Sequence, residues 1–107
     1  MCLSFGQRIL CDEIAGKYGE KQLTVAIEEM AELTQALTKY IRQSGGGQAV
    51  RKSPEEVMAG ITEEIADVEI MLEQVKYILD VSDDEVRAIA WKKLKRTKGI
   101  EKGRERR

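Results

Sequence analysis

Histidine is absent from the 107 residues of this sequence, and its absence restricts the possible chemistry more than any other feature. Ser-His and Cys-His catalytic pairs are excluded, as are most zinc sites and the Glu-x-x-His type of di-iron bundle. Any metal ion would have to be held by carboxylates. Carboxylate oxygens favour hard cations such as Mg²⁺, Mn²⁺ or Ca²⁺.

Cysteine, proline and aromatic residues are scarce. Cys2 and Cys11 have neither metal-ligand nor Cys-x-x-Cys spacing, so we interpret them as reduced thiols. One proline, 5% aromatic residues and 35% charged residues are typical of one small helical domain rather than a sheet. The apolar runs are too short to cross a membrane, and Arg8 lies where a signal peptide would have its apolar core. We therefore expect a cytoplasmic protein without a targeting segment.

The charges are distributed unevenly, although the net charge is only −1. Residues 92–107 hold nine Lys or Arg and two Glu, a formal charge of +7, so the preceding residues carry −8. An acidic body with a basic end suggests that the middle of the chain handles cations and the C-terminal segment handles anions.

Hydrophobic periodicity and helix-capping signals predict an all-α fold of four antiparallel helices. Ser53, Pro54 and Glu56 form a strong helix start, and Ser82 with Glu85 forms another capping box. We expect one domain over residues 1–98, interrupted by a flexible glycine-rich loop over 44–52 and followed by a basic, disordered tail over 99–107. The helices are predicted at about 5–18, 20–43, 54–79 and 83–98.

Two short stretches carry paired carboxylates in apolar surroundings. AIEEMAEL places Glu29 among the apolar side chains of its helix and Glu32 at the edge, and EEIADV repeats this arrangement with Glu64 and Asp67. Residues three apart on a helix are neighbours, so each helix presents two carboxylates together. The other nearby acids are interpreted as ordinary solvated surface: Glu28, Glu63, Glu69 and Glu73.

The two core-facing glutamates point to a metal site. Neither Glu29 nor Glu64 has a Lys or Arg three or four residues away, and an ionised carboxylate on a core-facing stripe is costly unless it is paired. If the two helices lie side by side, several negative charges share one pocket, and bound cations make that arrangement tolerable. Mg²⁺ in such a site keeps positions open for water and for substrate phosphates.

The spacing Glu29-x-x-Glu32 followed by Glu64-x-x-Asp67 on successive helices resembles the signature of the MazG-like all-α nucleoside triphosphate pyrophosphohydrolases. AIEEMAELTQALTKY and EEIADVEIMLEQ are similar to the second and third helices of that family. The run Lys93-Leu94-Lys95-Arg96 resembles its following basic segment. The resemblance covers residues 18–98, with a longer, glycine-rich connection between the two pairs than compact members have.

This resemblance implies hydrolysis of a (deoxy)nucleoside triphosphate to the monophosphate and pyrophosphate, with Mg²⁺ as cofactor and Mn²⁺ as a substitute. Glu29, Glu32, Glu64 and Asp67 would be the catalytic metal ligands. Lys93 and Arg96 would contact phosphate, although the same residues also suit a solvated helix end. Nucleotide-pool house-cleaning is the implied role.

Weaker apolar strips on the second and third helices, which include Ile27, Ala31, Ile70 and Tyr77, predict a homodimer or a dimer of dimers. Two alternatives to an enzyme stay open. One is a non-enzymatic helical interaction module, and the other is a nucleic-acid-binding regulator that uses the basic C-terminal segment. The acidic body and the lack of a base-reading motif argue against the regulator.

Overall fold

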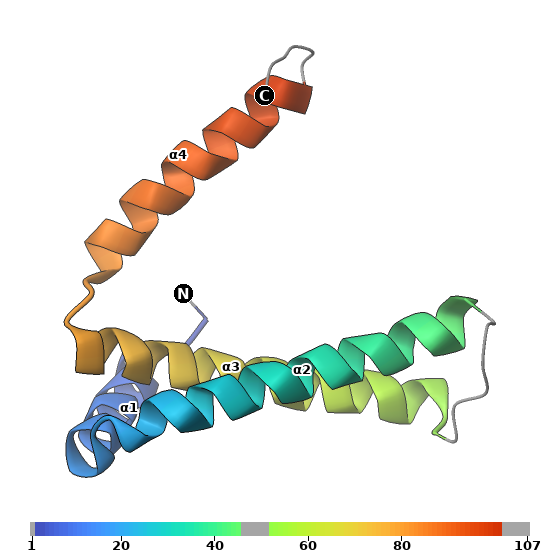
Figure 1. The fold of residues 1–107 in the computed structure, drawn as a ribbon, viewed down its shortest axis with the longest axis horizontal. Coiled ribbons are helices and arrows are strands. Elements are labelled where there is room, and N and C mark those ends of the chain that lie inside the picture. Colours follow the sequence, from blue (N-terminus) through green and yellow to red (C-terminus); the bar gives the residue numbers. More distant parts are fainter. Residues whose placement is uncertain (1, 46–51, 102–107) are drawn as a thin grey trace.

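The computed structural model describes residues 2–45 and 52–101 and is helical throughout its regular elements, with no strand in these two ranges (Figure 1). The helices are α1 (Phe5–Tyr18), α2 (Lys21–Gly45), α3 (Pro54–Leu79) and α4 (Asp83–Glu101). The predicted all-α class and the number of helices are confirmed. Most of the predicted glycine-rich loop (46–51) and of the predicted tail (102–107) lies outside the described residues.

Local hydrogen bonds explain where three of the helices begin. Ser53 and Glu56 form the predicted capping box at α3, with the Ser53 amide donating to Glu56 Oε1 at 2.9 Å. Ser82 and Glu85 form the same arrangement at α4, and Ser4 with Gln7 forms one at α1. These caps satisfy amides that the first turn of a helix leaves without partners. At its other end, α4 continues through the predicted stop at residue 99 to Glu101.

α2 and α3 run antiparallel and make the most extensive helix contact, and α1 packs mainly against α3 (Figure 1). Between them lies a small core, whose buried apolar side chains among the described residues are Cys11, Ala15, Ala26, Val57, Ile61 and Met71. Gln22 Nε2 donates to Gln74 Oε1 across the α2–α3 contact at 2.9 Å. The apolar side chains of α3 are buried only in part, because Ile65, Leu72 and Leu79 remain exposed.

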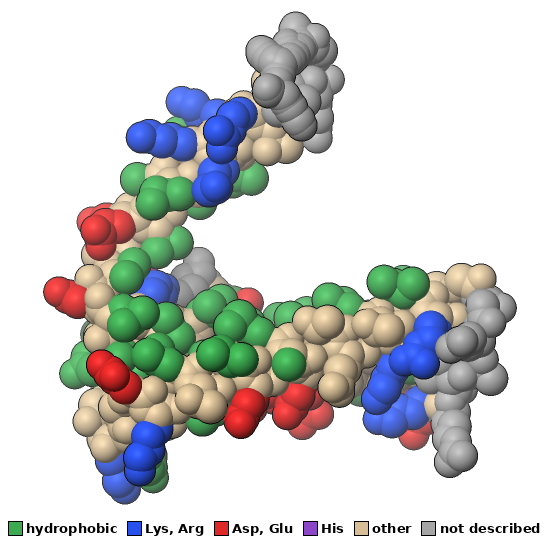
Figure 2. Space-filling model, viewed as in Figure 1, with side chains coloured by type: hydrophobic (Ala, Val, Ile, Leu, Met, Phe, Trp, Pro, Cys, Tyr) green, Lys and Arg blue, Asp and Glu red, His purple; other side chains and the backbone are tan. Residues whose placement is uncertain are grey.

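α4 extends away from the other helices and makes at most marginal contact with them (Figure 1). Trp91 and Leu94 are each 63% exposed, and Val86 and Ile89 are also exposed. The chain has a radius of gyration of 17.4 Å, against about 13 Å for a compact domain of this length. Figure 2 shows hydrophobic side chains lining the hollow between α4 and the α2–α3 pair. No helix in the described part of the chain combines the length and apolar composition needed to cross a bilayer.

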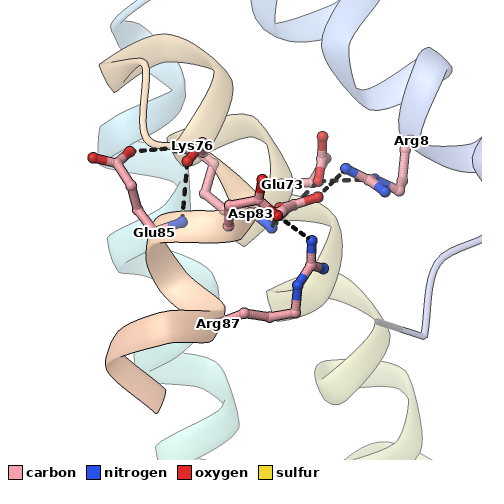
Figure 3. Close-up of polar contacts among 8 residues, drawn as sticks. Arg8, Glu73, Lys76, Asp83, Glu85 and Arg87 are labelled. Carbon is pink, nitrogen blue, oxygen red and sulfur yellow. Dashed lines mark hydrogen bonds and ion pairs between the residues drawn. The ribbon is translucent and has the colours of Figure 1, made fainter. Parts of the chain in front are cut away.

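The base of α4 is held by a charged cluster that joins α1, α3 and α4 (Figure 3). Asp83 pairs with Arg8 and, at 2.6 Å, with Lys76, while Glu73 lies 3.4 Å from Arg8 and 3.5 Å from Lys76. Glu73 is only 5% exposed, so its assignment to the solvated surface is wrong. Its burial, and then the neighbouring carboxyl group of Asp12, raises the pKa of Glu73. Periodicity could not reveal this burial, because α1 covers Glu73 from a distant part of the sequence.

Candidate metal centre

Three of the four predicted ligands come together between α2 and α3. One carboxylate oxygen each from Glu29, Glu64 and Asp67 lies within 4.8 Å of the others, and all three residues are half-buried. Glu29 follows the buried Ala26 by three residues on α2, and Glu64 follows the buried Ile61 by three residues on α3. The same packing that buries the two apolar residues therefore brings the carboxylates face to face.

Glu32 occupies the rim of this cluster. Its side chain is exposed, and it is not part of the group whose oxygens lie within 4.8 Å of one another. Together with Glu64 it lines an adjoining cavity, and its charge contributes to the raised pKa of both Glu29 and Glu64. The charge of Glu32 therefore acts on the cluster, although its side chain does not belong to it.

The cluster lacks internal compensation. Oε1 of Glu29 and Oε1 of Glu64 are both shielded from solvent and have no hydrogen-bond partner in the described structure. No ion pair reaches either residue within residues 2–45 and 52–101. Desolvation, followed by the charges of Glu32 and Asp67, raises the pKa of both glutamates. Shielded oxygens without donors, surrounded by like charge, are what a bound cation would stabilise.

The donor set fits a hard divalent cation. Glu29, Glu64 and Asp67 offer only oxygen ligands, from two helices that are themselves well packed, and Glu32 stands beside them as a further carboxylate. Mg²⁺ and Mn²⁺ prefer such oxygens, and Mg²⁺ keeps some coordination positions for water or phosphate. Soft-metal chemistry has no ligand here, because the buried Cys11 thiol lies on α1 and is not part of the group.

A cavity of about 290 Å³ adjoins the cluster between α2 and α3. Its acidic lining includes Glu63, which was assigned to ordinary surface; Glu63 is exposed and borders this cavity. Among the residues that the structure describes, its basic lining consists of Lys39 and Lys52. Figure 2 shows Lys and Arg side chains gathered where the end of α2 meets the start of α3, with acidic side chains further along the pair.

The two lysines of this cavity were not predicted as site residues. A signal for Lys39 exists in the sequence, since it follows Glu32 by seven residues, two turns along the same helix face. Lys52 had no periodic signal, because it lies in the connection just before α3. Its backbone carbonyl accepts a hydrogen bond from Gln43 Nε2 at 2.8 Å, which ties this connection to α2.

The predicted phosphate-binding residues are not brought to this cluster within one chain. Lys93 and Arg96 are exposed on α4, which does not pack extensively against α2 or α3. If Lys93 and Arg96 act at a carboxylate cluster, that cluster must belong to a second copy of the chain.

Comparison with known proteins adds no relative: no family model, curated protein or solved structure matches this chain.

Proposed function

We propose that the protein is a Mg²⁺-dependent nucleoside triphosphate pyrophosphohydrolase of the MazG-like type, acting in nucleotide-pool house-cleaning. The observation that carries this proposal is the meeting of Glu29, Glu64 and Asp67 around two shielded oxygens without donors. An acidic pocket of this kind attracts a divalent cation and, through the cation, a polyphosphate.

The four carboxylates have distinct roles in this proposal. Glu29, Glu64 and Asp67 hold the ion, with Glu32 on the rim toward the cavity. When bound, Mg²⁺ supplies Lewis acidity at the phosphate oxygens and lowers the pKa of a coordinated water. The raised pKa of Glu29 and Glu64 means that ion binding competes with protons at these carboxylates. In the net reaction one water is consumed, the bond between the α- and β-phosphoryl groups is broken, and nucleoside monophosphate and pyrophosphate are released.

The test is turnover of a panel of ordinary, deoxy and modified nucleoside triphosphates, with and without Mg²⁺. We expect monophosphate and pyrophosphate from at least one of them, and loss of that activity in Glu64→Gln and Asp67→Asn. Glu28→Gln is the matched control, because Glu28 is exposed beside Glu29 on the other side of α2. Absence of pyrophosphate from every triphosphate tested would remove the proposal.

We further propose that the active form is a homodimer or a dimer of dimers, with α4 packing against a second copy. The exposed apolar residues of α4 and the hollow beside them support this assembly. In such an assembly Lys93 and Arg96 would be available to contact phosphates at the partner's cluster.

A helical interaction module without catalysis is the competing function, favoured by the large exposed apolar surface. It predicts that Glu64→Ala stabilises the fold and that Mg²⁺ leaves the Tm unchanged. The enzyme proposal predicts a rise in Tm with Mg²⁺ that Glu64→Ala removes.

A further inference from the structure

The cavity beside the carboxylate cluster is polarised along its length. Glu32, Glu63 and Glu64 line it next to the cluster, whereas Lys39, Lys52 and one further acid, Glu56, line it toward the end where α2 finishes and α3 begins. Its volume of about 290 Å³ is at the lower limit of small-molecule sites. A ligand that fills it would therefore meet only carboxylates at one end, and two ammonium groups beside the Glu56 carboxylate at the other.

The ammonium groups of Lys39 and Lys52 are available for an anionic ligand. Neither Lys39 nor Lys52 forms an ion pair with any described residue. Glu56, which lines the same end of the cavity, forms the capping box with Ser53 and no ion pair with Lys52. Side chains on a helix lean toward its N-terminus, so Lys39 leans toward Glu32, whose Cα lies about 10 Å away along the axis of α2.

Gly60 is independent evidence that the cavity has room for a ligand. Gly60 lies inside α3 and lines the cavity one turn before Glu64. Glycine in a helix interior destabilises the helix relative to alanine. Close packing does not explain its presence, because a Cβ atom at Gly60 would meet nothing within 4 Å. The volume that a side chain would take is part of the cavity itself.

We propose that this cavity binds the pyrophosphate end of the triphosphate, with Lys39 and Lys52 pairing with its terminal phosphate. The inference rests on the proposed function and assigns the direction of the substrate: the cleaved bond lies at the carboxylates, and the leaving group extends over Gly60. The nucleoside then lies on the opposite side of the cluster. The same two lysines neutralise the charge that develops on the leaving pyrophosphate.

The experiment measures binding of pyrophosphate and, separately, of nucleoside monophosphate to the full chain by calorimetry in the presence of Mg²⁺. We expect Lys39→Gln and Lys52→Gln each to weaken pyrophosphate binding about tenfold, because each removes a charged hydrogen-bond partner. Monophosphate binding should stay within twofold of the wild type. Lys39→Arg should keep most of the pyrophosphate affinity, and Lys21→Gln, at the other end of α2, is the matched control.

A steric variant tests the same space without changing charge. Gly60→Leu places a good helix former where the structure has room, so the protein should fold with an unchanged or higher Tm while losing pyrophosphate binding. Wild-type pyrophosphate affinity in the lysine variants or in Gly60→Leu would overturn the inference, as would an equal loss of monophosphate binding.

Binding and turnover separate this inference from the proposed function. If the lysine variants still hydrolyse a triphosphate and keep the wild-type affinity for pyrophosphate, the pyrophosphate assignment is refuted and the proposed enzymatic function stands. Lysine-dependent pyrophosphate binding in a protein that hydrolyses no triphosphate would support the anion site and refute the enzyme. A wild-type protein that binds no pyrophosphate refutes the assignment directly.

Discussion

The exposed apolar face of α4 leads to a sharp prediction about assembly, tested by Leu94→Glu. Leu94 is 63% exposed in the single chain. If the chain were monomeric, a charge at this position would change the stability of folding by no more than about 0.5 kcal/mol, as at other surface sites. If Leu94 is covered by a second copy, the same charge would be buried without a partner, at a cost of several kcal/mol.

The size of the expected interface follows from the accessible surface. The chain exposes 8103 Å², whereas a compact monomer of 12.1 kDa exposes about 6,000 Å². The excess of about 2,000 Å² per chain would give an interface of about 4,000 Å² in total if a dimer covered all of it. That is within the range of obligate homodimers. We therefore expect no detectable monomer at micromolar concentration.

Sedimentation velocity across a hundredfold dilution is the appropriate assay, combined with thermal unfolding. Leu94→Glu should shift the protein toward monomer and lower its Tm. The control, Lys92→Gln, makes the same change of −1 in charge on the opposite side of α4 and should leave both quantities unchanged. A wild-type protein that sediments as a monomer, or a Leu94→Glu variant that assembles normally, would refute the reasoning.

Three further predictions concern the charged groups. Mg²⁺ at about a hundred times its Kd should stabilise the fold by about 2.7 kcal/mol. The measurement is the Tm with Mg²⁺ compared with the Tm in buffer free of Ca²⁺ and Mg²⁺. An unchanged Tm would contradict the proposed metal site. The pKa values of Glu29 and Glu64 are raised, so the native state keeps protons that the unfolded state has already released. Stability of the metal-free protein should therefore fall as the pH rises above the ordinary glutamate pKa of about 4.3, and the effect of Mg²⁺ should grow over the same range; urea titrations from pH 4 upward, with Glu64→Gln flattening the metal-free slope, check both. Finally, Glu73→Ala should lower the free energy of unfolding by about 1–3 kcal/mol, because Arg8 and Lys76 lose a buried partner. An unchanged urea midpoint would show that the ion pairs of Glu73 contribute nothing to stability.

Features with a local cause could be predicted from the sequence. The start of α3 depends on Ser53 and Glu56, three residues apart, and the hydrogen bonds between them formed as expected. The meeting of Glu29 with Glu64 and Asp67 required only helical periodicity and the assumption that consecutive helices pack antiparallel.

Features that depend on distant partners could not be predicted in this way. Glu73 looks like any other glutamate of a charged helix until Arg8, 65 residues earlier, is placed beside it. The direction of α4 has no local determinant beyond its first turn, where Asp83 is tied to Arg8 and Lys76. The position of Lys52 in the cavity lining depends on how the connection returns to α2, which hydrophobic periodicity does not encode.

The hydrogen bond between Gln22 and Gln74 has a consequence for the carboxylate cluster, which it does not touch. Gln74 is 2% exposed, so its side-chain oxygen depends on Gln22 for a donor. Glu29 follows Gln22 by seven residues on α2, and Asp67 precedes Gln74 by seven residues on the antiparallel α3. A slip of one helix against the other would break the amide pair and separate the carboxylates by the same step. The two glutamines therefore fix the register of the two helices two turns from the carboxylates, so the spacing of the proposed ion-binding site depends on an uncharged pair in the core.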